Sequence, residues 1–319
     1  MMIDATQIDE FPPELKQYIK ILLTICAYAG SGNVIKIQEL QQVVAKKKED
    51  VNPKVKQLAI IGMSIIAIGE DIGMEMLPRS FNHFLQFGDT TVKKAVCLAY
   101  AFLSISYPKL NVIDALIKFT YDTNKEVAIN SIFSLGIVAA GTNNSKLSSE
   151  LRKMAGAYAE EEEIIPYIRF SQGLLNLGKG SLSLNPIHSN GLLLSNTALA
   201  GMMITLLSFT EGEGLIGGKY QYLLYSICLA IKPRMVMSLD SNLEIKPITL
   251  AVGQAVDTIG MHGNPRTISG FQVNKTPLLI NAGERCEMND DDFLAETNIL
   301  EDVIIVKDKP EELRKKENK

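Results

Sequence analysis

The first half of the chain alternates between two kinds of helical pattern. One is almost continuously apolar, as in SLGIVAAG at residues 134–141. The other has apolar side chains at every third or fourth position, as in LNVIDALIKFTY at residues 110–121. The first kind predicts a helix buried on all sides, and the second predicts an amphipathic helix with one solvent face. Together they predict helical hairpins, each pairing a buried helix with a half-exposed one.

The apolar segments recur at a nearly constant interval. The copies GMSIIAIG, AYAFLSIS, SLGIVAAG and SQGLLNLG end at positions 69, 106, 141 and 178, which gives spacings of 37, 35 and 37 residues. A weaker copy, TICAYAGSG, places Gly30 39 residues before Gly69. A fixed period of this length is typical of a helical repeat array or solenoid.

Small side chains at matching positions give this array a packing mechanism. A glycine inside a helix costs about 1 kcal/mol relative to alanine, and we expect close packing between neighbouring hairpins to offset that cost. The glycine that closes a copy is expected to supply a left-handed helix cap. The structural repeat positions predicted in this way are Gly30, Gly69, Ser106, Gly136, Gly141, Gly173 and Gly178.

Two longer apolar segments follow the repeats, at residues 191–209 and 215–231. Each is about as long as the shortest membrane-spanning helix. The first contains Ser195, Asn196 and Thr197, the second contains Lys219, and the flanks lack clusters of basic residues. These features favour two buried central helices, and a membrane-associated protein stays open as an alternative.

From residue 233 the hydrophobic period changes to two. The runs MVMSL, EIKPITLAV, RTISGFQV and VIIVK predict short strands, with turn signals at HGNP and NAG. The expected fold is mainly α, a solenoid of helical hairpins followed by a small antiparallel β domain. The predicted divisions are repeats at 1–190, central helices at 191–232, the β domain at 233–307 and a polar tail at 308–319.

Charge and cysteine content indicate which partners and which cellular compartment to expect. The 319 residues carry a net charge of −4, which does not suit the basic face of a nucleic-acid-binding protein. The four cysteines lie far apart without CxxC spacing, so we expect buried, reduced thiols in a cytoplasmic or nuclear protein. The acidic start of the chain has no apolar core of a secretory signal.

No arrangement of residues with catalytic spacing is present. GKGS at residues 178–181 lacks the spacing of a phosphate-binding loop, and His188 has no nucleophile spaced to use it, so we expect a loop histidine bonded to backbone. The acidic runs at 160–163 and 289–293 are expected to be solvated turns and not metal sites. The sequence therefore predicts a protein that is not an enzyme and that has no cofactor or metal.

Several long strings resemble a known family. They are CAYAGSGNVIKIQEL, NSIFSLGIVAAGTNN, LLNLGKGSLSLNPIHS, GKYQYLLYSICLAIKPRMV and GQAVDTIG…RTISGFQ…TPLLINAGERCE. Together they resemble the C-terminal third of the largest non-ATPase base subunits of the 26S proteasome cap, the 19S regulatory particle. Proteins of this family are built from proteasome/cyclosome repeats. The resemblance is most specific at residues 129–186 and 217–287.

The resemblance implies a non-catalytic scaffold in the cytoplasm and nucleus. It implies a partial toroid of repeats around two central apolar helices, followed by a small β domain. The implied partners are the proteasomal ATPase ring, ubiquitin, shuttle proteins with ubiquitin-like domains and a deubiquitinase, with no nucleic acid and no membrane. The family's main ubiquitin-binding helices lie upstream of residue 1, so no binding residue is assigned. A repeat scaffold like the anaphase-promoting-complex subunit is a further alternative.

Overall fold

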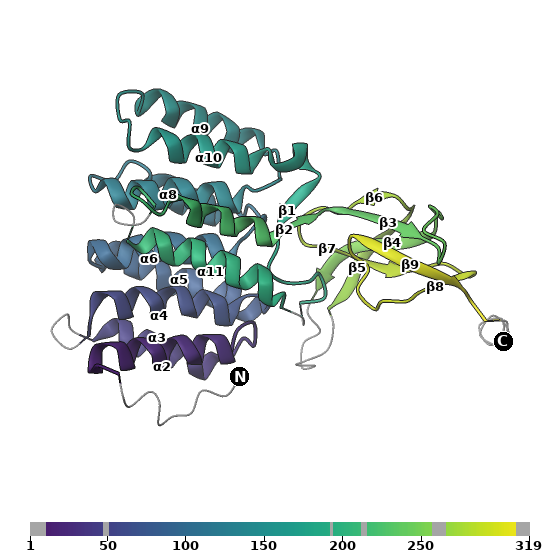
Figure 1. Cartoon of the computed structure of the whole chain (residues 1–319), viewed down its shortest axis with the longest axis horizontal. Coiled ribbons are helices and arrows are strands. Elements are labelled where there is room, and N and C mark those ends of the chain that lie inside the picture. Colours follow the sequence, from purple (N-terminus) through teal and green to yellow (C-terminus); the bar gives the residue numbers. More distant parts are fainter. Residues whose placement is uncertain (1–10, 47–50, 192–193, 212–215, 257–265, 311–319) are drawn as a thin grey trace.

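A computed structural model describes residues 11–46, 51–191, 194–211, 216–256 and 266–310. In this part of the chain, helices fill the first two thirds and strands dominate the rest (Figure 1). The helices of the repeat region are α2 Pro13–Ala27, α3 Val34–Ala45, α4 Pro53–Ala67, α5 Asp71–Phe87, α6 Thr90–Leu103, α7 Leu110–Phe119, α8 Lys125–Val138, α9 Ser145–Ala157 and α10 Ile165–Leu175.

These helices form stacked hairpins, as the repeat predicts. The apolar helices α2, α4, α6, α8 and α10 pack against one another in chain order, and each amphipathic helix packs chiefly on the apolar helix that follows it. Figure 1 shows the hairpins as layers from α2 and α3 to α9 and α10. The mainly α fold of helical hairpins with a small β region is thereby confirmed.

Asparagine side chains fix where many of these helices begin. The Asn124 side chain accepts hydrogen bonds from the backbone N–H groups of Glu126, at 3.0 Å, and Val127, at 3.2 Å, at the start of α8. Such caps satisfy N–H groups that have no partner inside a helix. Asn33, Asn52 and Asn144 cap α3, α4 and α9 in the same way.

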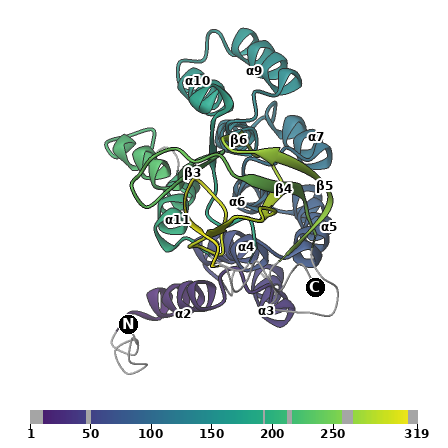
Figure 2. The same ribbon diagram turned by 90° about the vertical axis from the view of Figure 1, so that its right-hand side faces the viewer.

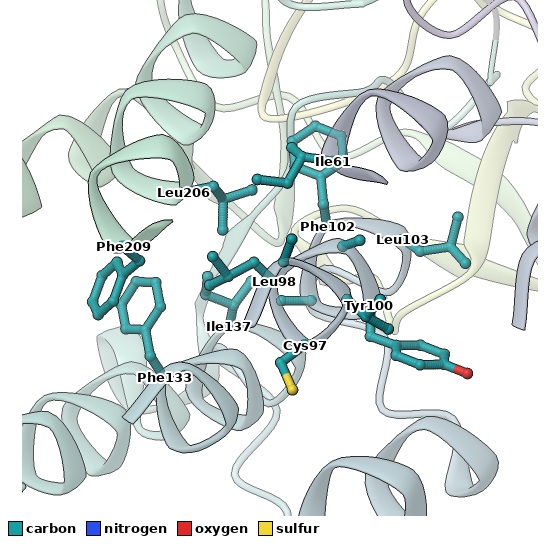
Figure 3. Packing of buried hydrophobic residues seen from close by; sticks show 14 of the residues in the cluster. Ile61, Cys97, Leu98, Tyr100, Phe102, Leu103, Phe133, Ile137, Leu206 and Phe209 are labelled. Atoms are coloured by element: carbon teal, nitrogen blue, oxygen red, sulfur yellow. The ribbon is translucent and has the colours of Figure 1, made fainter. Parts of the chain in front are cut away.

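The apolar helices are buried on every side. In α4 every residue from Val55 to Ala67 is buried, because α2, α3, α5 and α6 all pack against it. A further helix, α11 (Asn196–Thr210), lies across α4 and α6. Figure 3 shows Phe209 of α11 facing Phe133 of α8, and their ring centroids are 3.8 Å apart. The core of the repeats is therefore continuous with α11.

The two central apolar segments differ from the prediction. The first becomes helical only at Asn196, because Leu194 forms an isolated β-bridge with Ile187. The second forms a 3₁₀-helix, η2 (Gln221–Ala230), packed on α11. Its Tyr225 is 76% exposed, so the expectation of a buried second helix is wrong for this chain. No helix among the described residues is long and apolar enough to span a bilayer.

The C-terminal strands form a β unit beside the helical stack, to the right of the helices in Figure 1 and in front of them in Figure 2. Its larger sheets have the orders β6-β3-β9-β8 and β5-β4-β7. The strands are β3 Met235–Leu239, β4 Thr249–Val256, β5 Thr267–Lys275, β6 Leu278–Leu279, β7 Glu284–Met288, β8 Phe293–Ala295 and β9 Val303–Asp308. β3 and β9 are parallel, so the purely antiparallel expectation is corrected to a mixed arrangement.

A two-stranded ribbon joins the helices to the β unit. β1 (Leu182–Leu184) pairs antiparallel with β2 (Ile231–Pro233). The segment that follows the repeats and the segment that leads into the β unit therefore lie side by side. The sequence pattern gave no sign of β1, since three residues are too few to show a period of two. A short 3₁₀-helix, η1 (Leu177–Gly180), precedes β1.

Candidate functional site: the joint between the repeats and the β unit

The turns that close the apolar helices follow the C-terminal ends of these helices and line up along one side of the stack. The residue that closes each repeat has left-handed backbone, with φ of 68° at Gly30, 91° at Gly69, 51° at Ser106, 67° at Gly141 and 55° at Gly178. We call these five residues the ridge. Four of them are glycines, which adopt positive φ without steric cost, and Ser106 adopts it despite its side chain.

Hydrogen bonds join several ridge residues to the next repeat. Three ridge residues donate their backbone N–H to the last turn of the next apolar helix. These bonds are Gly30 to Ile65 at 3.0 Å, Ser106 to Ile137 at 3.2 Å and Gly141 to Leu174 at 2.9 Å. The left-handed turn therefore links each repeat to the next as well as ending its own helix.

The β unit and its connecting ribbon are bound to three consecutive ridge residues. The Arg266 guanidinium donates to the Gly69 carbonyl at 2.6 Å, and Arg234 donates to the Gly141 carbonyl at 2.8 Å. Between them, the Leu184 backbone N–H donates to the Ser106 hydroxyl at 2.9 Å. The joint thus spans three repeats. Each contact gives a hydrogen-bond partner to a carbonyl or hydroxyl group of a ridge residue.

Close backbone approach explains the glycine at position 141. A Cβ atom added to Gly141 would lie 1.8 Å from the carbonyl oxygen of Leu182. Gly136 acts between helices, because its Cβ would lie 2.8 Å from the Ser171 Cα of the next repeat. Gly173 is the equivalent position one repeat later, and its Cβ would meet nothing within 4 Å. The structure therefore places no close helix contact at Gly173.

A charged cluster lies beside the ridge. His188 Nδ1 is 3.0 Å from a Glu301 carboxylate oxygen, and the Ser189 backbone N–H donates to the other oxygen. Lys232 Nζ lies 4.0 Å from the same carboxylate. His188 therefore binds a carboxylate from the far end of the chain, which corrects the expectation of a histidine bonded to backbone.

The environment of Glu301 favours its charged form. Burial alone would raise its pKa, but hydrogen bonds from Ser189 and His188 outweigh burial and lower the pKa below the usual value. For Asp302 burial prevails and raises the pKa, despite the opposing charge of Lys232. The cluster lines a cavity of about 400 Å³ between the repeats and the β unit.

The charged groups of the joint bind one another. His188 and Glu301 engage each other, and the Ser189 side chain also hydrogen-bonds to Glu301. No group of metal-ligating side chains was found among the described residues. The geometry suits a fixed connection between the repeats and the β unit.

The other candidates from the sequence are distributed over the surface. Lys125 pairs with Glu161 at 2.8 Å and with Glu163 at 3.2 Å, so part of the acidic run is ion-paired. In the second acidic run, the Asp290 carboxylate accepts the backbone N–H of Thr249 and two N–H groups of its own turn, which lowers its pKa against the effect of burial. Of the two histidines besides His188, His83 lies exposed beside Phe87, and His262 is outside the described residues.

The residues that bind the joint together were not found from the sequence. Arg234 lies 93 residues from Gly141, and Arg266 lies 197 residues from Gly69. Both arginines stand in segments quoted above, but nothing in those segments singled them out, because the partner of each is a backbone carbonyl that any residue could supply. Only the turn glycines themselves gave a signal.

Comparison with known proteins places the chain among proteasome subunits. The family described as "26S proteasome non-ATPase regulatory subunit RPN1 C-terminal" matches residues 259–311. The chain is 40% identical over 296 residues to 26S proteasome regulatory subunit rpn-1 of Neurospora crassa, covering 91% of this chain and 33% of the relative. It is 40% identical over 303 residues to 26S proteasome non-ATPase regulatory subunit 2 homolog A of Arabidopsis thaliana, covering 94% and 34%.

A third relative extends this similarity. The 26S proteasome non-ATPase regulatory subunit 2 of Dictyostelium discoideum is 39% identical over 294 residues, covering 92% of this chain and 32% of the relative. The chain therefore spans about a third of the length of the curated relatives that it matches.

Proposed function

Since the chain belongs to the family of the 26S proteasome regulatory subunit RPN1, we propose that it is a non-catalytic scaffold of the proteasome regulatory particle. The observation that carries the proposal is similarity over 91% to 94% of the chain to relatives named as proteasome regulatory subunits. The stack of hairpins supports it, because helical repeat proteins use extended surfaces to bind partners.

The proposed role has two parts. The first is docking on the ATPase ring of the regulatory particle. The second is recruitment of ubiquitin, shuttle proteins with ubiquitin-like domains, and a deubiquitinase, in the cytoplasm and nucleus. The names of the relatives in Arabidopsis thaliana and Dictyostelium discoideum, non-ATPase regulatory subunits, support a role without ATP hydrolysis.

Affinity purification tests the docking role. We would tag the gene product in its own cells and purify it in the presence of Mg²⁺ and ATP. The expected result is co-purification of the six subunits of the ATPase ring, identified by mass spectrometry. Recovery of the tagged protein without any ATPase subunit would refute the docking role.

Titration of isotope-labelled ubiquitin with this chain tests the recruitment role. Specific binding should shift a contiguous set of ubiquitin resonances, and a labelled ubiquitin-like domain should respond similarly. Unchanged spectra for both proteins would show that these residues do not recruit ubiquitin. The docking role would be unaffected, since the two experiments measure separate contacts.

A further inference from the structure

A second cleft lies next to the joint, and its described lining carries only positive charge. The cleft has a volume of about 490 Å³ and lies between the repeat turns and the β unit. Its charged lining residues are Lys179 and Arg234, and no aspartate or glutamate lines it among the described residues. Asn143, Asn144 and Asn281 add amide groups to the walls.

Arg234 lies between this cleft and the cavity beside Glu301. It lines both, and its Nε and Nη1 atoms donate to the carbonyls of Ile280, at 3.1 Å, and Gly141, at 2.8 Å. Carbonyls hold the guanidinium in place without neutralising its charge. A guanidinium has five N–H donors, so further donors are left after these two bonds. Burial lowers the pKa of Arg234, as expected for a partly desolvated cation.

No described carboxylate lies within ion-pair distance of these two cations, although the charge of Glu284 acts on Arg234 from further away. Neither Lys179 nor Arg234 forms an ion pair with a described residue. Glu284 is the acidic group whose charge acts on Arg234, but its two oxygens accept from Asn281, from the backbone N at 2.9 Å and from Nδ2 at 3.2 Å. A partly buried cation without a counter-ion favours binding of an anion.

The rest of the lining indicates which anion fits. Tyr107 is 41% exposed and Leu279 is 52% exposed, and both line the cleft beside the cations. Apolar surface next to positive charge suits a carboxylate whose neighbour in the chain is apolar. A nucleic acid is disfavoured, because two cations cannot offset repulsion of its backbone by a protein with a net charge of −4.

We propose that this cleft binds an acidic peptide segment of a partner protein. An aspartate or glutamate carboxylate of the segment would bind Arg234 and Lys179, and an adjacent apolar side chain would pack on Tyr107 and Leu279. The proposal concerns a contact made by this chain itself. It does not depend on assembly into a regulatory particle, so it can fail while the proposed function stands.

Fluorescence anisotropy with a labelled peptide tests the proposal. The probe is fluorescein-labelled Gly-Ser-Leu-Asp-Glu-Leu-Ser-Gly, and its twin carries Asn-Gln in place of Asp-Glu. We expect the acidic probe to bind at low ionic strength, to dissociate as salt rises, and to bind at least tenfold more tightly than the twin. Equal affinity for the two peptides, or no binding of either, would overturn the proposal.

A single substitution then locates the site. Lys179→Asn removes the charge, and asparagine tolerates the left-handed φ of 56° at this position. We expect it to weaken binding of the acidic probe about tenfold, as for the loss of one charge-assisted hydrogen bond. The control is Lys118→Gln, which neutralises an exposed lysine of α7 outside the cleft and should leave binding unchanged. Equal effects of the two substitutions would refute the assignment to the cleft.

Two further measurements test the role of Arg234 and the chemical identity of the bound anion. Arg234→Gln should abolish binding, and because it also breaks the contact with Gly141, its thermal unfolding must be measured in parallel. Loss of binding with a cooperative unfolding transition supports the site, and retained binding refutes it. A phosphoserine version of the probe that binds while the carboxylate version does not would replace the acidic peptide with a phosphopeptide and overturn the proposal.

Discussion

The guanidinium of Arg234 donates a 2.8 Å hydrogen bond to the carbonyl oxygen of Gly141, 93 residues earlier in the chain. The backbone N–H of Gly141 meanwhile donates to Leu174 in the next repeat. One turn residue therefore binds its own repeat to the following one and both to the β unit.

Gly141→Ala should destabilise the protein by at least about 2 kcal/mol. Alanine disfavours the φ of 67°, and its Cβ would overlap the Leu182 carbonyl. Urea unfolding followed by circular dichroism measures the change. The matched control is Gly173→Ala, which should stabilise the protein by about 0.5–1 kcal/mol, because this helical position faces open space. A stable Gly141→Ala variant would contradict the tight turn.

Replacements of Ser106 should separate backbone strain from hydrogen bonding. Both Ser106→Gly and Ser106→Ala remove the acceptor of the Leu184 N–H, but only alanine keeps the cost of positive φ. Alanine should therefore be less stable than glycine by about 1 kcal/mol. Parallel urea titrations of the two variants give this difference directly. Equal stability would show that the turn relaxes when the side chain changes.

Acid should weaken the joint through Glu301. Its pKa is lower in the folded protein than in the unfolded chain, so its stabilising contribution is complete above the unfolded carboxyl pKa of about 4.3. That contribution is lost as pH falls through the folded pKa. Free energies of unfolding from pH 7 to pH 3 should therefore fall more steeply for the native protein than for Glu301→Gln. Parallel pH profiles would show that this carboxylate does not couple protonation to folding.

The four cysteines should divide into two classes of reactivity. Cys26 and Cys228 are exposed, while Cys97 and Cys286 are buried, with pKa values raised to about 12 by burial. The expectation that all four are buried is therefore wrong for two of them. Reaction with a colorimetric disulfide reagent should modify two thiols quickly, and the other two only after denaturation. Fast modification of all four would indicate that the core opens readily.

The repeat could be recognised in advance because it is a local property of the chain. Apolar runs such as 134–141 indicate a helix that is buried on all sides. The recurrence of Gly69, Gly141 and Gly178 indicates a turn whose backbone must adopt positive φ. Ser106 fits the same interval, and the structure gives it the same left-handed backbone. Periodicity and turn chemistry act over a few residues, so they are visible without knowledge of the fold.

The joint could not be recognised in advance, because its contacts depend on how distant segments meet. The apolar run at 215–231 indicates burial in general but does not say whether the segment becomes an α-helix or the exposed 3₁₀-helix η2. The parallel pairing of β3 with β9 also follows from chain topology and not from a period of two.

The sequence by itself determined a stack of helical hairpins closed by small turn residues, since hydrophobic periodicity and left-handed backbone are encoded within each repeat. Only the tertiary structure decided that Arg234 and Arg266 bind the carbonyls of Gly141 and Gly69, and that a positively charged cleft lies beside them. The physical reason is that a backbone carbonyl is the same at every position, so its partner is selected by geometry alone.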